Sequence, residues 1–347
     1  FTTKFDETTL ATEFGVRGFA HPRITFDAGA DRLDIDRYFP PAKPGPGNDS
    51  ADPREDPKVD LSALKDLNVA GEARVARLKA RGVRADNVQL VVRIADGRLD
   101  VAPLTAALYG GRLRATANAA AGNRIGVDAN LTGISIGPLL RDALDRDILE
   151  GTGNVKLVAT TAGSTVGGLA RGLNGSGNLA LRDGAIKGVN IAARLREARA
   201  FLSAGRQEAA RASSTEKTDF SELAASFTIK DGVATSNDLD GRSPLLRLAG
   251  AGRVDLGAGT LDYTARVAVV GTLKGQDGRD LAELRGVTVP VRLHGPFEKL
   301  SYEIDWGAVA QEALKAKATE QLKQKVAPQL QDQRDKLRDQ LKGLLRR

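Results

Sequence analysis

Apolar residues recur at every second position over most of this chain, and this alternation limits the folds that it can adopt. Between residues 261 and 269, Leu261, Tyr263 and Val267 are separated by polar residues such as Asp262 and Arg266. In a strand, this spacing places every apolar side chain on one face and leaves the other face polar. The sequence therefore predicts a mainly β fold whose strands share one apolar face. The residues that we expect on this face are Val88, Leu90, Val92, Leu179, Leu181, Phe227, Ile229, Leu246, Leu248, Val254, Leu256, Leu261, Tyr263, Val267, Val269, Val289, Val291 and Leu293.

Asp-Gly pairs mark the joints between several of these runs. They stand at 96–97, 183–184 and 231–232, each after an apolar-rich run. Glycine readily adopts the positive φ of tight two-residue turns, so an Asp-Gly pair between alternating runs is a strong hairpin signal. We therefore expect antiparallel strands that are joined locally and that turn at these three pairs.

Four segments differ in composition and periodicity. Residues 1–39 are strand-like, and residues 40–60 are rich in proline, which predicts a flexible loop. Residues 61–304 carry most of the alternation, with two short helices predicted at 138–144, where Pro138 opens the helix, and at 191–202. Residues 305–347 change to helical spacing and predict a basic amphipathic helix. The apolar side of this helix is formed by Leu314, Leu322, Leu330, Leu337, Leu341 and Leu344.

This C-terminal helix has two possible roles. Amphipathic helices usually pack their apolar side on the protein core, and we favour such a lid on the sheet. The basic end also suits contact with a membrane surface or with a partner protein.

The composition excludes several kinds of site. The chain has no Cys and two His, His21 and His294, so thiolate and histidine-rich metal sites are excluded and we expect no metal. The net charge is +7, but basic and acidic residues are interspersed and aromatic residues make up 4% of the chain. Few rings are then available to stack on bases, which argues against nucleic acid. Phosphate-loop and dinucleotide fingerprints are absent, so we expect no cofactor.

One stretch has the pattern of a catalytic motif. Residues 133–137, Gly-Ile-Ser-Ile-Gly, fit the G-x-S-x-G nucleophile elbow and precede a predicted helix, with His294 downstream. That motif works in a parallel α/β sheet, whereas this chain predicts antiparallel hairpins, and Ile134 and Ile136 simply continue the alternation. We therefore expect no catalytic residue and no enzyme, and a hydrolase based on Ser135 is the least favoured alternative.

The predicted apolar face is too large for the few predicted helices to cover. An apolar face of more than a few hundred Å² is either covered or functional. The strands could form a two-sheet sandwich, close into a barrel, or bend into an open trough that takes an apolar ligand. Periodicity alone does not distinguish the three. A closed, dry sandwich would suit a structural module that acts through protein contacts.

A succession of stretches along the chain has the pattern of a known family. The clearest part, residues 131–153, contains Leu-Thr-Gly-Ile-Ser-Ile-Gly-Pro-Leu-Leu-Arg-Asp-Ala-Leu. The other stretches are residues 31–41, 104–111, 162–166, 173–177, 181–191, 220–223, 227–232 and 248–256. The motifs are diffuse, and together they cover roughly residues 30–305. This succession resembles the C-terminal region of the AsmA family of Gram-negative envelope proteins.

The resemblance implies an open trough and a function in lipid transport. Proteins of this family are held in the inner membrane by an N-terminal helix, extend into the periplasm, and are considered bridge-like phospholipid carriers. For this chain, the resemblance implies an antiparallel sheet curled into an elongated groove with phospholipid along its apolar lining. It also implies a periplasmic location and an inner-membrane anchor upstream of the sequence. The alternative to lipid transport is a structural module that assists outer-membrane protein insertion through protein contacts, for which we expect a closed, dry sandwich. The chain begins with Phe1 and has no Met, so we expect the anchor and the first part of the groove to lie in a preceding segment.

Overall fold

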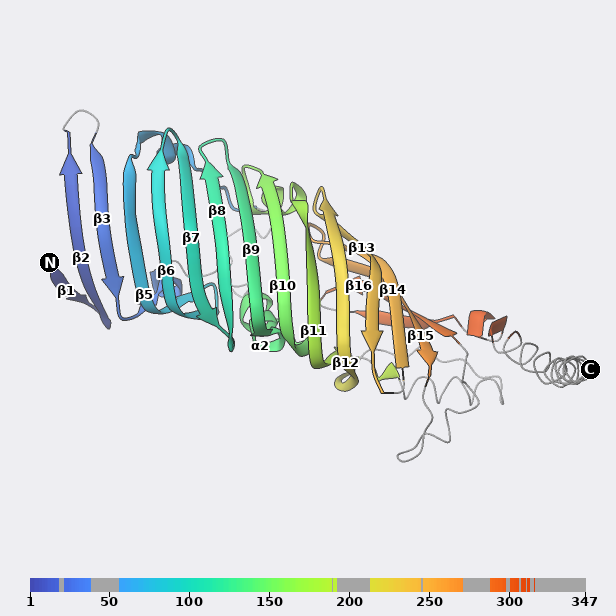
Figure 1. The fold of residues 1–347 in the computed structure, drawn as a ribbon. Helices are drawn as coiled ribbons and strands as arrows, with labels where there is room; N and C mark the ends of the chain where they lie inside the picture. Colours follow the sequence, from blue (N-terminus) through green and yellow to red (C-terminus); the bar gives the residue numbers. More distant parts are fainter. Residues whose placement is uncertain are drawn as a thin grey trace, which may run out of the picture.

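The computed structural model describes residues 1–18, 22–38, 56–188, 190–191, 213–244, 246–270, 288–297, 300–305, 307–309, 311–312 and 315. Within these residues the chain forms one long sheet of 17 strands, accompanied by a few short helices (Figure 1). All strands belong to the same sheet and the sheet is open. The predicted mainly β class and the open, mostly antiparallel sheet are confirmed, whereas the sandwich and the closed barrel do not describe this chain.

Most of the strands have ten residues or more. The strands are β1 (Thr2–Phe5), β2 (Thr8–Arg17), β3 (Arg23–Ala30), β4 (Leu33–Asp34), β5 (Val69–Ala80), β6 (Val83–Ala95), β7 (Arg98–Leu108), β8 (Gly111–Ala120), β9 (Arg124–Ser135), β10 (Leu149–Ala162), β11 (Asn174–Gly188), β12 (Ser213–Lys230), β13 (Val233–Arg242), β14 (Leu246–Asp255), β15 (Thr260–Val269), β16 (Thr288–Pro296) and β17 (Ser301–Ile304). The helices are α1 (Ile35–Tyr38), the 3₁₀ helix η1 (Ser62–Asp66), α2 (Ile136–Leu144) and α3 (Val166–Arg171).

The strands pair almost entirely in chain order. From β5 to β17 each strand is antiparallel to the next, as local hairpin connections require. The exception lies near the N-terminus, where β3 and β4 both run parallel to β5. A tight turn cannot join a parallel pair, and in the sequence β4 and β5 are separated by residues 35–68. The expectation of antiparallel pairing throughout is therefore wrong at this one step.

Two of the three predicted Asp-Gly turns are confirmed. Asp96-Gly97 joins β6 to β7, Asp231-Gly232 joins β12 to β13, and all four residues have positive φ. The turn predicted at 183–184 is wrong, because Asp183 and Gly184 lie inside β11. Asp183 has a φ of 49°, and the register of β11 with β10 shifts there, so the pair forms a β-bulge and the strand continues to Gly188.

The helical predictions are confirmed in part. Helix α2 begins at Ile136, two residues before the predicted start, and Pro138 falls in its first turn, where a missing N–H leaves no hydrogen bond unmade. Of the helix predicted at 191–202, only Ile191 lies among the described residues. Most of the proline-rich loop and the six leucines of the C-terminal helix also lie outside them, so the four-segment division stays a prediction.

Two clusters of buried side chains form the core. One includes Val88, Ile134 and Leu181 near the middle of the sheet and receives Leu139 and Leu140 from α2. The other lies on β14–β17 and includes Val267 and Val289, which are 0% and 1% exposed. The core is therefore concentrated at particular places along the sheet.

Candidate functional site: the apolar face of the sheet

One side of the sheet is apolar from β2 to β16, and we call it the inner face. Residues opposite one another in paired strands point to the same side, so the pairing register traces the face directly. One cross-strand row contains apolar residues and glycine throughout. Its members are Phe14, Phe26, Gly71, Val92, Val101, Ala117, Val127, Ala159, Gly175, Ile229, Ala234, Val254, Leu261 and Gly295.

A second row of the same character runs beside the first. It passes from β6 to β12 through Leu90, Leu104, Ala115, Ala129, Leu157, Gly177 and Phe227. In the middle of the sheet several of these side chains, such as Val92, Val127 and Leu157, are only half-buried. The inner face is thus a continuous apolar surface, and part of that surface remains exposed to solvent.

The opposite side, the outer face, is polar in the same register. A row from β8 to β17 contains Thr116, Asp128, Val158, Ser176, Thr228, Thr235, Arg253, Asp262, His294 and Ser301. Arg292 donates two hydrogen bonds to Asp262 at 2.9 and 3.1 Å, and this guanidinium lowers the pKa of the Asp262 carboxyl. Oppositely charged neighbours on this face explain why many basic residues do not form one positive patch.

The predicted lining residues fall on the inner face, but with two kinds of surroundings. Leu90, Val92, Leu179, Phe227, Val254, Leu261, Tyr263 and Leu293 are half-buried, whereas Val88, Leu181, Ile229, Leu246, Leu248, Val267, Val269, Val289 and Val291 are buried. The buried residues of β14–β16 pack with Ile191, Tyr302 and Val309. Leu256 lies in the turn after β14 and is 38% exposed. A lining role for these residues stays a prediction, and the half-buried group is the one accessible to a ligand in this structure.

Sequence reasoning missed several strands that carry the same face. The inner positions of β8 are Leu113, Ala115, Ala117 and Ala119, but alanine also follows at 120 and 121, which hides the alternation. In β7 a register shift separates the inner residues Val101 and Leu104 by three positions. Small residues and bulges therefore conceal part of the pattern.

Hydrogen bonds hold the strands of the middle of the sheet at both of their ends. At one end, Asp142 of α2 accepts a hydrogen bond from the Tyr109 hydroxyl at 2.8 Å, and Asp36 of α1 accepts one from the Gly82 amide at 2.8 Å. At the opposite end, residues 56–66 form what we call the rim segment. These contacts fix the two ends of the strands between β5 and β10.

The rim segment is fastened by an acidic side chain at its start. The Asp56 carboxylate accepts hydrogen bonds from the Thr165 hydroxyl at 2.6 Å and from the Gly167 amide at 2.7 Å. These donors lower the pKa of Asp56. Asn123, in the turn between β8 and β9, holds the next residues by donating to the Val59 carbonyl at 2.8 Å.

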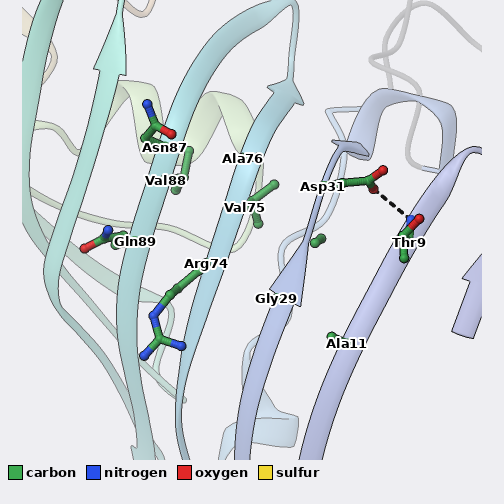
Figure 2. A pocket seen from close by; sticks show the side chains of 11 residues that line it. Thr9, Ala11, Gly29, Asp31, Arg74, Val75, Ala76, Asn87, Val88 and Gln89 are labelled. Atoms are coloured by element: carbon green, nitrogen blue, oxygen red, sulfur yellow. Dashed lines mark hydrogen bonds between the residues drawn. The ribbon is translucent and has the colours of Figure 1, made fainter. Parts of the chain in front are cut away.

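A separate hollow lies on the outer face between β2, β3, β5 and β6 (Figure 2). It measures about 420 Å³ and is wide open, with Arg74, Asn87 and Gln89 among its polar side chains. Arg74 already pairs with Asp27 at 2.9 Å, and Asp31 accepts the Thr9 amide at 2.7 Å. The charged groups in this hollow are thus satisfied within the protein.

The structure places the two residues of the elbow hypothesis, Ser135 and His294, on different strands. Ser135 ends β9 immediately before α2, so a strand-to-helix junction does exist, but in an antiparallel sheet. His294 lies on β16, and its nearest acidic partner is Glu303 at 3.4 Å. Among the described residues, no three His, Cys, Asp or Glu side chains are grouped so that they could hold a metal ion.

Comparison with known proteins identifies the family. The model of the AsmA family matches residues 45–239, which is more than half of the chain. This chain belongs to the AsmA family. It is also similar to Protein AsmA of Escherichia coli strain K12, with 27% identity over 254 residues. That alignment covers 72% of this chain and 40% of the relative, so the chain corresponds to less than half of the relative's length.

Membership of the AsmA family supports a role connected with the Gram-negative envelope and its outer membrane. No solved structure matches the chain. Among the described helices, none has the length and apolarity that crossing a bilayer demands.

Proposed function

We propose that this AsmA-family chain binds phospholipid by its acyl chains along the inner face and carries it between the inner and outer membranes. The observation that supports the proposal most is the cross-strand row of the inner face, which contains no charged residue between β2 and β16. An acyl chain lying across the strands would meet an apolar side chain or a glycine at each strand.

The physical basis is burial of methylene groups without directional bonds. Each methylene removed from water contributes about 0.8 kcal/mol, and a one-sided surface provides a fraction of that. Because neighbouring positions along a row are chemically alike, a lipid can shift by one strand at little change in free energy. The head group stays in water, so no buried polar site is needed to hold it.

The proposal also includes a location in the cell and a function without catalysis. We place the chain in the periplasm, attached to the inner membrane, and assign contact with an envelope partner to the helix predicted from the sequence for residues 305–347. We assign no enzymatic activity and no cofactor, because binding and diffusion along the face are sufficient for transfer. Cell fractionation with an antibody to the chain tests the location independently of lipid binding.

The direct experiment is native mass spectrometry of the chain purified from a Gram-negative host without detergent. The proposal expects adducts with the masses of phospholipids, which disappear after delipidation and return on incubation with phospholipid vesicles. A chain that carries no lipid before or after incubation would show that the inner face is not a lipid site.

A further inference from the structure

Three large aromatic side chains on the inner face each stand directly opposite a glycine of the neighbouring strand. Phe26 of β3 pairs with Gly71 of β5, Phe227 of β12 pairs with Gly177 of β11, and Tyr263 of β15 pairs with Gly252 of β14. All three residues are half-buried, so each keeps part of its surface exposed to solvent.

The rings occupy the space that a side chain at the glycine would take. A Cβ built on Gly71 would lie 2.5 Å from Phe26 Cδ1, and one on Gly177 would lie 2.5 Å from Phe227 Cζ. A Cβ on Gly252 would lie 2.5 Å from Tyr263 Cδ2. Real Cβ atoms do not approach other atoms so closely, so each ring lies down against the backbone of the next strand.

Tyr263 shows the arrangement most completely. Its ring extends along β14 from Gly252 to Gly250, where a Cβ would lie 2.8 Å from Tyr263 Cε1. Beyond β14, its hydroxyl donates a hydrogen bond to Ser236 Oγ of β13 at 3.2 Å. Burial of the ring raises the pKa of the hydroxyl, which therefore remains a donor at neutral pH. The ring therefore covers the two glycines of β14, and its hydroxyl is held by β13.

We propose that these glycines are positioning residues that keep the aromatic rings flat and thereby set the depth of the lipid groove. This inference rests on the proposed function. A ring that stands upright on the inner face projects into the path of an acyl chain, whereas a flat ring adds apolar floor. A methyl group at the glycine forces the ring away from the backbone and towards the groove.

Gly250 offers the cleanest test. The nearest atoms to its added Cβ are the side-chain atoms Tyr263 Cε1 at 2.8 Å and Leu239 Cδ2 at 2.9 Å, and the nearest backbone oxygen is at 3.2 Å. At Gly177, in contrast, the Lys156 carbonyl oxygen would be at 2.5 Å, so a substitution there disturbs strand pairing as well.

The experiment compares three variants of the full chain for loading with fluorescent phospholipid from vesicles of phosphatidylethanolamine and phosphatidylglycerol. Gly250→Ala tilts the ring, and Gly250→Ala combined with Tyr263→Ala removes it. Gly126→Ala is the matched control on the outer face, where the added Cβ would lie 2.9 Å from the Asn118 side chain. Circular dichroism and thermal unfolding establish that each variant is folded.

Gly250→Ala is expected to lower loading about fivefold or more, from the lower end of the ~1–3 kcal/mol cost of overpacking. The double variant should load better than Gly250→Ala, because no ring then projects into the path of the acyl chain, and Gly126→Ala should load like the unaltered chain. Normal loading by Gly250→Ala, or no recovery in the double variant, would overturn the role of the ring while leaving lipid binding intact. If the unaltered chain takes up no lipid, the proposed function fails and the inference fails with it.

Discussion

Introducing a carboxylate into the inner face should reduce lipid binding without unfolding the protein. Val127 lies in the inner-face row between Ala117 and Ala159 and is half-buried. In the empty protein, Asp at position 127 stays in contact with water, so the fold should survive the Val127→Asp change. With an acyl chain in place, that water has to leave and the carboxylate loses its hydration.

The size of the effect follows from the strand spacing. About four methylene groups of an extended acyl chain span the ~4.8 Å between neighbouring strands. If one-sided contact provides about half of ~0.8 kcal/mol for each, the loss is about 1.6 kcal/mol. This corresponds to roughly 15-fold weaker lipid binding at 1.4 kcal/mol per factor of ten.

The assay is equilibrium binding of fluorescent phospholipid to the purified chain. Val158→Asp is the matched control, because Val158 lies on neighbouring β10 but points to the outer face, between Asp128 and Ser176. Equal loss of binding in both variants, or no loss in Val127→Asp, would refute the assignment of the two faces.

Three further outcomes are expected. Ile134→Ala should destabilise the protein by ~2–5 kcal/mol in urea unfolding, because this side chain is 0% exposed and its removal leaves a cavity. Asp56→Asn should speed hydrogen exchange of the Gly167 amide, because a neutral amide replaces the carboxylate and accepts weaker hydrogen bonds from Thr165 and Gly167. Because the pKa of Asp56 is lowered in the folded state, its contribution is present above the ordinary value of 3.8 and is lost as the pH falls through the lower folded value, so acid should mimic the variant. Ser135→Ala should retain full lipid loading and envelope function in a complementation assay, and a loss without unfolding would revive the hydrolase alternative.

The alternation of apolar residues was sufficient to predict the fold class, because apolar residues at every second position indicate a β-strand with one apolar face. Val254, Leu261 and Val291, for example, all fall on the face that the spacing predicts. The Asp-Gly pairs predicted two hairpins, but the same dipeptide forms a bulge at Asp183. Positive φ is common to both structures, and only the pairing of the strand beyond it distinguishes them.

The parts of the site that sequence did not predict depend on contacts distant along the chain. The parallel step between β3 and β5 has no local signal, since it arises from a crossover. The burial of Val267 and Val289 depends on Ile191 and Val309, which come from other segments. Likewise, the match between Tyr263 and Gly252 exists only in the register of β14 with β15. Periodicity identifies a face, whereas tertiary contacts decide which parts of it stay open.

Photo-crosslinking along β9 in living cells tests the central claim most directly. A photoreactive amino acid placed in turn at Gly126, Val127, Asp128 and Ala129 samples the outer and inner faces alternately over consecutive positions. The lipid-groove account predicts phospholipid adducts at Val127 and Ala129 and none at Gly126 and Asp128. Adducts at the outer positions, or at none of the four in a folded and correctly located protein, would contradict it.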